Sequence, residues 1–171
     1  MRTLLLDRDG VINHDSHDFI RTAADWRAFP GSLEAIVRAQ RAGYRIVVVS
    51  NQSGLARRLL GIADLNAIHR RLQDELERIG GYIDAFFFCP HGPDEGCQCR
   101  KPAAGLLQSV QQRLGIDLQG TPFVGDRLSD VEAARAVGAR PILVRSGMHA
   151  VPDDSELEIF DDLSCAVTAL L

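Results

Sequence analysis

TLLLDRDGVI, residues 3–12, is a short apolar run that leads directly into two carboxylates and a glycine. The run from Thr3 to Leu6 is too short for a helix, so it predicts a buried strand of a parallel sheet. Asp7 and Asp9 then fall at the carboxyl end of this strand, where open α/β sheets bind their ligands. Alternation along the extended chain directs both carboxylates to one side and Arg8 to the other.

Two carboxylates this close together need a partner. Their repulsion costs on the order of several kcal/mol unless a cation lies between them or one of them is protonated. A divalent cation that prefers oxygen ligands, most simply Mg²⁺, is the natural partner for Asp7 and Asp9. The alternative is an ordinary surface turn, because Asp and Gly are both common turn residues.

Length and composition are those of an ordinary globular chain. With 171 residues, 46% hydrophobic and 25% charged, we expect a single domain over residues 1–171. The net charge of −4 argues against binding to nucleic acid or to a membrane surface. We expect a cytoplasmic protein, since no signal peptide or membrane-spanning run is present. We also expect a monomer. Three of the four cysteines crowd into residues 89–99, which favours a metal site, and Cys165 is expected to be buried in an apolar helix.

Apolar strands alternate with amphipathic helices along the rest of the chain. We expect further strands at residues 44–49, 83–88, 122–124 and 141–144, and helices at 32–42, 64–79, 103–114, 129–137 and from 163 onward. Repeated β-α units imply a parallel sheet with helices on both faces. The predicted fold is a doubly wound, three-layer α/β domain, with no insertion long enough to form a large cap domain.

Other predicted strands also deliver polar side chains at their carboxyl ends. Ser50 and Asn51 offer donors for an anionic oxygen, or alternatively Ser50 only caps a turn. Asp126 would add a third carboxylate, and Asp130 would either orient it or hold a lysine. Lys101 precedes a predicted helix and offers a phosphate a fixed positive charge.

A dense loop carries three thiols and an imidazole in the pattern C-x-H-x5-C-x-C. Cys89, His91, Cys97 and Cys99 form two close pairs of ligands, which predicts a closed tetrahedral structural zinc site. The alternative is a set of ordinary reduced thiols beside a surface histidine. Because the loop runs on to Lys101, zinc would also fix the position of that lysine.

Taken together, the motifs resemble those of the haloacid dehalogenase-like phosphatases. They are, in order, Asp7-x-Asp9-Gly10-Val11, Ser50-Asn51, Lys101-Pro102 and Gly125-Asp126-x-x-x-Asp130. The resemblance implies that Asp7 is the nucleophile and that Asp9 is the general acid and base. It also implies that Ser50 and Lys101 hold the phosphoryl oxygens, and that Mg²⁺ is bound by Asp7, the main-chain carbonyl of Asp9, and Asp126. Because Asp9 must be protonated in the first step, we expect a raised pKa or a hydrogen bond in the complex.

The zinc loop and the stretch DRDGVIN at residues 7–13 narrow the resemblance further. They are similar to the D-glycero-D-manno-heptose 1,7-bisphosphate phosphatases and to histidinol-phosphate phosphatase domains. The first similarity implies removal of the 7-phosphate in lipopolysaccharide-core synthesis, and the second a step of histidine biosynthesis. Histidinol-phosphate domains often occur fused to a dehydratase, for which this chain has no room. A more remote alternative is a phospho-accepting receiver domain, whose aspartate follows the third strand instead of the first.

The heptose resemblance also implies a set of substrate contacts. They come from Asp15, Ser16, His17, Asp18, Ser50, Asn51, Gln52, Ser53, Arg100, Lys101 and Arg127. Carboxylate and hydroxyl groups suit a sugar, and arginines suit a second phosphate that is bound but not cleaved. The neighbouring Arg57 and Arg58 either attract that phosphate or face water.

Overall fold

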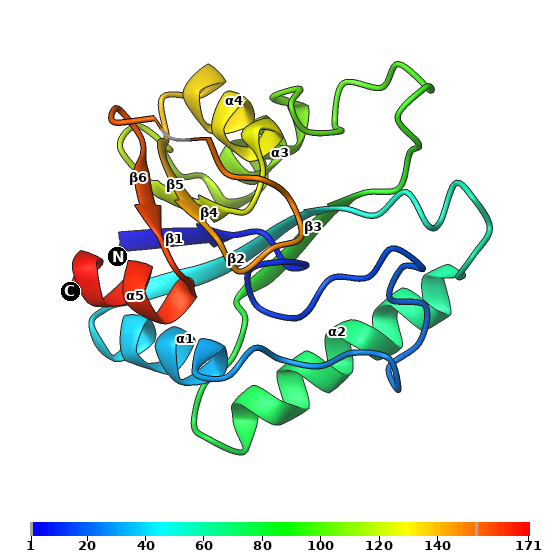
Figure 1. Ribbon diagram of the computed structural model, residues 1–171, viewed down its shortest axis with the longest axis horizontal. Coiled ribbons are helices and arrows are strands. Elements are labelled where there is room, and N and C mark those ends of the chain that lie inside the picture. The colour runs from blue at the N-terminus through cyan, green and yellow to red at the C-terminus, as the bar shows by residue number, and fades with distance from the viewer. Residues whose placement is uncertain (1, 153) are drawn as a thin grey trace.

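A computed structural model describes residues 2–152 and 154–171 and contains one six-stranded sheet with helices on both faces (Figure 1). The elements are β1 (Arg2–Leu6), α1 (Ser32–Arg41), β2 (Tyr44–Asn51), α2 (Ile62–Glu77), β3 (Ala85–Cys89), α3 (Gly105–Leu114), β4 (Pro122–Gly125), α4 (Leu128–Ala136), β5 (Arg140–Val144), β6 (Glu158–Phe160) and α5 (Leu163–Leu170). The strand order is β3-β2-β1-β4-β5-β6, and all five pairs are parallel. The predicted doubly wound fold is confirmed.

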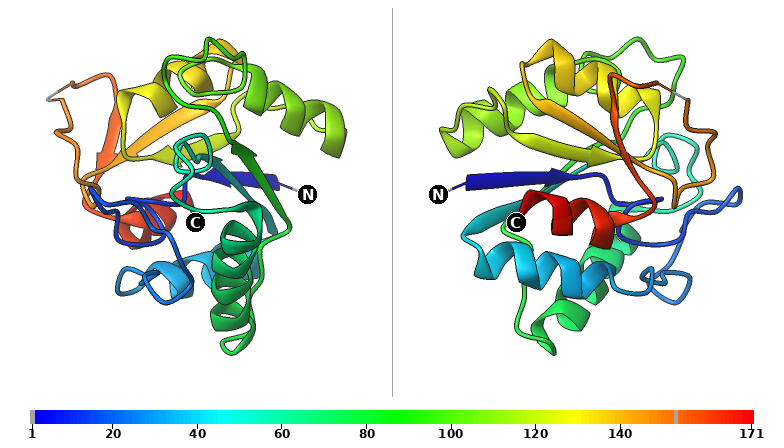
Figure 2. Two further views of the ribbon diagram at one scale, coloured as in Figure 1. Left: turned by 90° about the vertical axis from the view of Figure 1, so that its right-hand side faces the viewer. Right: turned by 60° about the vertical axis from the view of Figure 1, so that its left-hand side comes forward.

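Two hydrophobic cores lie on the two faces of the sheet. Leu4 and Leu6 of β1 point into a core shared with α1, α2 and α5, whereas Leu5 points into a core shared with α3 and α4. Figure 2 shows these two groups of helices on opposite sides of the strands. Because both faces are covered, the central strands are apolar at successive positions, which is why they read as continuous apolar runs.

The sheet reverses its winding direction between β1 and β4. These neighbours are in register at Leu6 and Val124, and the backbone N–H of Asp7 donates to the carbonyl of Val124 at 2.9 Å. Connections leave the two strands toward opposite sides at such a switch point, which opens a crevice at their carboxyl ends. Asp7 and Asp126 therefore enter the same crevice from adjacent strands.

Three strands differ from the sequence-based expectation, and one of them is β3, which begins at Ala85, two residues later than predicted. Strand β2 runs two residues further than predicted, because Ser50 and Asn51 still pair with Phe88 and Cys89 of β3. The edge strand β6 was not predicted at all. Its three residues, Glu158–Phe160, are too few to show a periodic pattern, and pairing with β5 forms the strand.

Two side chains lie differently from expectation. Ile79 falls beyond the end of α2 and is 40% exposed, so it does not extend the apolar face of that helix. Cys165 is exposed, because it lies on the solvent side of α5, and the expectation of a buried thiol is wrong.

Helix α3 begins at Gly105, two residues later than predicted, so Lys101 lies in the loop before it.

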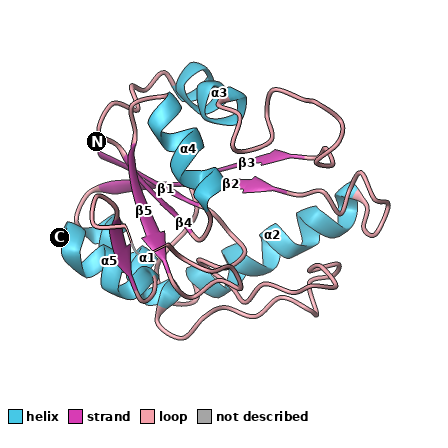
Figure 3. Cartoon of the chain, turned by 45° about the horizontal axis from the view of Figure 1, so that its top comes forward, coloured by secondary structure: helices cyan, strands magenta, loops and turns pink. Residues whose placement is uncertain are grey.

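Loops dominate the end of the molecule where the strands finish (Figure 3). Across residues 2–152 and 154–171 the strands are joined by loops and helices, and no separate cap domain is formed. In the same described part of the chain, none of the helices has the length and apolar character that crossing a bilayer requires.

Candidate active site

A pocket of about 270 Å³ opens at the carboxyl edge of the sheet. It brings together most of the predicted site residues: Asp7, Asp9, Asp15, Ser16, His17, Asn51, Gln52, Ser53, Arg100, Lys101, Arg127 and Asp130. Ser50 and Asp126 lie just beneath its surface, each 1% exposed. Asp18 is exposed and lies outside the pocket lining, so the structure does not bring this predicted contact to the site.

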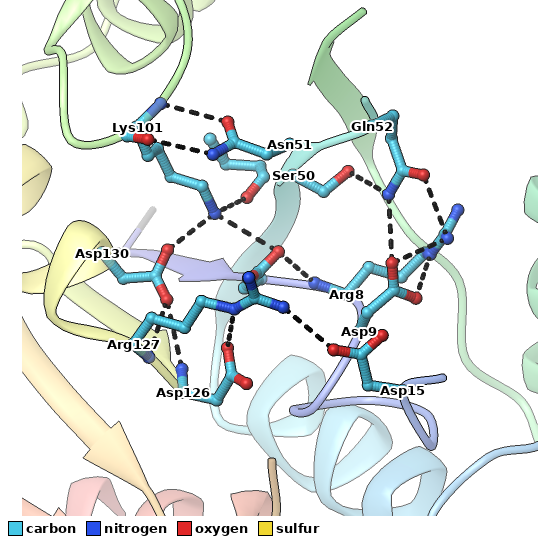
Figure 4. Close-up of polar contacts among 12 residues, drawn as sticks. Arg8, Asp9, Asp15, Ser50, Asn51, Gln52, Lys101, Asp126, Arg127 and Asp130 are labelled. Carbon is cyan, nitrogen blue, oxygen red and sulfur yellow. Dashed lines mark hydrogen bonds and ion pairs between the residues drawn. The ribbon is translucent and has the colours of Figure 1, made fainter. Parts of the chain in front are cut away.

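Lys101 is buried at the centre of the site (Figure 4). Its Nζ lies 2.7 Å from Asp130 Oδ1 and 3.3 Å from Asp7 Oδ1, and it donates to the carbonyl of Val49 at 2.8 Å. Burial disfavours the charged amine, but the charges of Asp130 and Asp7 outweigh it and raise the pKa of Lys101. The lysine therefore stays protonated and offers its charge beside Asp7.

Asn51 holds the backbone of Lys101 in place. Its Nδ2 donates to the Lys101 carbonyl, and its Oδ1 accepts from the Lys101 N–H, both at 3.0 Å. Both ends of the amide are thus occupied by the main chain. This use differs from the predicted one, in which Asn51 donates to an anionic oxygen of the substrate.

Three carboxylates meet beside the lysine. Oxygens of Asp7, Asp126 and Asp130 lie within 4.8 Å of one another. Burial, with the negative charges of Asp130 and Asp9, raises the pKa of Asp7 to about 7 against the opposing charge of Lys101. Burial and the charges of Asp7 and Asp130 raise the pKa of Asp126 to about 8.

Asp126 is shaped for a cation. Among the described residues neither of its buried carboxylate oxygens has a hydrogen-bond partner, although Nε of Arg127 lies 3.6 Å from Oδ1. Its side chain packs against two glycines, Gly10 and Gly147, where any added Cβ would collide with the carboxylate. An unpartnered carboxylate next to Asp7 is the donor set that a hard divalent cation prefers. The residues present therefore fit Mg²⁺.

Asp130 connects the two halves of the site. While Oδ1 pairs with Lys101, Oδ2 accepts from the backbone N–H groups of Asp126 and Arg127, each at 3.1 Å. These two bonds cap the start of α4 and fix the turn that carries Asp126. One side chain thus sets the position of both the lysine and the carboxylate suited to the metal.

Arg8 forms a bidentate ion pair with Asp9, a contact that strand alternation did not predict. Nε and Nη2 of Arg8 each donate to one carboxylate oxygen at 2.9 Å, and Arg8 is fully buried. Gln52 also donates to Asp9, at 3.2 Å, and Asn13 at 2.9 Å. Burial opposes ionisation, but the Arg8 charge and these hydrogen bonds outweigh it, so the pKa of Asp9 lies below its ordinary value. The expectation of a raised pKa or a hydrogen bond for Asp9 concerns the complex with substrate, so it stays a prediction.

Arg127 is paired with an acidic residue of the pocket rim. Its Nη2 lies 2.9 Å from Oδ2 of Asp15, and its Nε is the group near Asp126. The sequence placed both Asp15 and Arg127 against the substrate, whereas the structure pairs them with each other. Arg127 thus links the rim to the carboxylate site and is not a free cation.

The four predicted zinc ligands converge. Sγ of Cys99 lies 3.1 Å from Sγ of Cys89 and 3.7 Å from Sγ of Cys97, and His91 Nδ1 lies 3.2 Å from Cys99 Sγ. A tetrahedron with metal–sulfur bonds of about 2.3 Å has edges of about 3.8 Å, so the separation of Cys99 from Cys97 matches it and the other two are several tenths of an ångström shorter. The cluster fits a closed structural zinc site, with all four positions filled by the chain.

We expect added Mg²⁺ to raise the melting temperature more at pH 8 than at pH 5.5. The folded-state pKa values of Asp7 and Asp126, about 7 and about 8, lie above the ordinary 3.8. Without the cation the folded state holds protons that the unfolded state has lost, so stability falls as pH rises toward 8. Mg²⁺ replaces those protons, and it competes with them at pH 5.5.

Thermal melts at both pH values, with and without Mg²⁺, test this expectation, with Asp126→Asn as the control that should lose the effect. An equal Mg²⁺-induced shift at the two pH values would contradict it.

Comparison with known proteins gives consistent matches. A family model described as HAD-hydrolase-like matches residues 98–166. A D-glycero-beta-D-manno-heptose-1,7-bisphosphate 7-phosphatase from Pseudomonas aeruginosa is 46% identical over 172 residues, covering 98% of this chain and 97% of the relative. The enzyme of the same name from Pseudomonas putida is 45% identical over the full length of both chains. The crystal structure of D,D-heptose 1,7-bisphosphate phosphatase from B. bronchiseptica, complexed with magnesium and phosphate, is 43% identical, with a TM-score of 0.93 over 99% of this chain and 98% of that one.

The fold, the carboxylate pocket and these matches define the class of protein, a phosphomonoester hydrolase of the haloacid dehalogenase type. Within that class, the chain belongs to the family of the D-glycero-D-manno-heptose 1,7-bisphosphate 7-phosphatases. The resemblance drawn from the four motifs is thereby confirmed.

The sequence did not predict several residues of the site. Arg8 is buried outside the pocket lining but contacts Asp9. Strand alternation points it away from Asp7, yet a long side chain can turn back to its neighbour. Met148 and His149 line the pocket from the segment after β5. The rule that strand ends carry the site would have found them, had it been applied to the fifth strand as well as to the first four.

Proposed function

We propose that this enzyme removes the 7-phosphate of D-glycero-D-manno-heptose 1,7-bisphosphate through an aspartyl-phosphate intermediate. The observation that carries the proposal is Lys101, buried between Asp7 and Asp130 at the switch point of the sheet. A fixed positive charge beside a carboxylate offsets the repulsion between that carboxylate and an incoming phosphate. The reaction belongs to the synthesis of lipopolysaccharide-core precursors.

In the proposed first step, a carboxylate oxygen of Asp7 attacks phosphorus and the bond to the sugar oxygen breaks. Asp9 gives its proton to that leaving oxygen. In the second step Asp9 takes a proton from water, which attacks the phosphorus and releases inorganic phosphate and the Asp7 carboxylate. Lys101 and Ser50 hold the phosphoryl oxygens throughout, because the transition state carries its charge on them.

Asp9 has to acquire its proton when substrate binds. The ion pair with Arg8 lowers the pKa of Asp9 and favours its ionised form. A phosphate dianion entering beside Asp9 adds a negative charge that opposes the Arg8 charge and shifts the pKa of Asp9 upward. Arg8 then orients the carboxyl group of Asp9, and the charge of the bound substrate brings about its protonation.

We propose that Asp7, the main-chain carbonyl of Asp9, and Asp126 hold Mg²⁺, which supplies Lewis-acid stabilisation of the phosphoryl charge when bound. The magnesium and phosphate in the B. bronchiseptica neighbour support this assignment, as does the unpartnered carboxylate of Asp126. The cluster of three thiols and one imidazole supports structural Zn²⁺.

The rim supports a sugar bisphosphate as substrate. Asp15, Ser16 and His17 suit hydroxyl groups, and Arg100 suits a second phosphate. The names of the relatives point to the same substrate. We further propose that the chain acts as one domain and as a monomer, and that it works in the cytoplasm, since a reducing compartment keeps the cluster thiols available for zinc.

We expect kcat/KM for heptose 1,7-bisphosphate to exceed that for histidinol phosphate by about 10²-fold or more. This ratio requires only about 3 kcal/mol of differential transition-state binding. Histidinol phosphate has a single phosphate, so it would leave the rim arginines without a partner. Parallel steady-state kinetics on the two substrates test the assignment. If histidinol phosphate is the equal or better substrate, the heptose assignment is wrong and the phosphatase chemistry stands.

A further inference from the structure

The cationic side chains of the pocket differ in how many ion pairs and hydrogen bonds they already form within the protein. Lys101 is held by Asp7 and Asp130, and Arg127 is held by Asp15 and Asp126. Arg100 donates to the carbonyl of His91 at 3.4 Å. Arg57 lines the same pocket, and its guanidinium has no hydrogen bond or ion pair with any residue that the structure describes.

The cationic side chains at the carboxylate site are fewer than the carboxylates, so none of them is available to neutralise a second phosphate. Five carboxylates (Asp7, Asp9, Asp15, Asp126 and Asp130) face three cations (Arg8, Lys101 and Arg127), an excess of two negative charges. One divalent cation balances that excess. A phosphate that is bound but not cleaved must then be neutralised by arginines outside this set.

An aromatic ring holds Arg57 without occupying its donors. The guanidinium carbon lies 5.6 Å from the centroid of the Phe19 ring, within the range of a cation–π contact. Phe19 also lines the pocket. A cation–π contact takes up none of the N–H donors of the guanidinium, which stay free to bind phosphate oxygens.

The loop that carries Arg57 is held by its own backbone. The N–H of Arg57 donates to Ser53 at 3.0 Å, and the N–H of Leu59 donates to Gly54 at 2.9 Å. A Cβ on Gly54 would lie 2.5 Å from Cδ2 of Leu60 and 3.5 Å from the Phe19 ring, so the Leu60 side chain would have to shift. Arg58 follows with a φ of 57° and lies outside the pocket lining. The two adjacent arginines are thus placed differently.

We propose that Arg57 is a specificity-determining residue that binds the phosphate retained in the product, with Phe19 holding its guanidinium. The assignment rests on the proposed function, since it requires a substrate with two phosphates. It explains how the enzyme recognises the second phosphate although Arg127 is paired with Asp15.

The test compares heptose 1,7-bisphosphate with heptose 7-phosphate, which lacks only the retained phosphate. Arg57→Gln should raise KM for the bisphosphate by about tenfold or more, with kcat changed less than about twofold and the monophosphate kinetics unchanged. Arg57→Lys should recover part of the loss, because it restores the charge without the planar fork. Phe19→Leu should give a smaller increase in KM for the bisphosphate. Arg58→Gln is the matched control and should behave as wild type.

Several results would overturn the assignment, each for a different reason. If Arg57→Gln raises KM equally for both substrates, the residue acts on the pocket in general. If Arg57→Gln and Arg58→Gln have the same effect, only the surface charge matters. If the wild-type enzyme does not hydrolyse heptose 1,7-bisphosphate, the proposed function fails and the Arg57 assignment fails with it. Equal wild-type kcat/KM for the two substrates, or a preference for the bisphosphate that survives in Arg57→Gln, removes the Arg57 assignment alone.

Discussion

Asp7→Asn should lower turnover by at least about 10³-fold. The amide keeps the shape of the side chain but removes the attacking oxygen and one charge from the cluster around Lys101. Binding of Mg²⁺ should weaken as well, because Asp7 and Asp126 lose the joint negative charge that favours a cation. Steady-state kinetics at saturating Mg²⁺ measure the effect.

Two variants make this test specific. Asp18→Asn makes the same carboxylate-to-amide change at an exposed position outside the pocket, and it should leave activity unchanged. Asp9→Asn should also be severe with a sugar substrate. With p-nitrophenyl phosphate, whose leaving group needs no proton, it should still release one burst of p-nitrophenol per enzyme, since only the second step requires the base. Asp7→Asn should give no burst, and retention of a tenth of wild-type turnover by this variant would exclude the covalent mechanism.

The residues that follow the strands were the part of the site that could be predicted from the sequence. Asp7 and Asp126 follow apolar strands that are buried on both faces, and parallel pairing brings their carboxyl ends together. The cysteine loop was predictable because its four ligands lie within eleven residues. In each case local order along the chain determines proximity in space.

Pairing among the charged side chains was not predictable in the same way. Arg127 contacts Asp15 across 112 residues, and Arg8 turns back to Asp9 although alternation separates them. Long flexible side chains choose among nearby partners according to packing and charge, which depend on the complete fold. The strand β6 shows the same limit, because three residues at a sheet edge acquire their structure from the neighbouring strand.

The zinc cluster and the catalytic pocket share a strand pair and a loop. Cys89 is in register with Asn51, and Asn51 holds the backbone of Lys101 through two hydrogen bonds. On the other side, Cys99 lies two residues before Lys101 along the chain. The backbone N–H of Gly105 donates to the carbonyl of Gln98 at 2.9 Å, which ties the loop to the start of α3. Loss of the metal should therefore disturb the position of Lys101 in two ways, through Asn51 and through the loop that follows Cys99.

Cys97→Ser should abolish stoichiometric zinc binding, lower the melting temperature and reduce kcat. Structural zinc contributes its binding free energy to folding, so loss of the metal should cost at least several kcal/mol of stability. Cys165→Ser is the matched control, because this exposed thiol lies outside the cluster and its loss should change none of the three quantities. Elemental analysis, thermal melts and kinetics on the same preparations give the comparison.

Turnover measured well below the melting temperature of Cys97→Ser separates positioning from stability. If zinc only holds the fold together, the folded variant should retain wild-type kcat under those conditions. If zinc also positions Lys101 through Asn51 and the loop, kcat should stay low while KM changes little, because the lysine stabilises charge that develops on the phosphoryl oxygens in the transition state. Fully active protein that contains no zinc would exclude both roles.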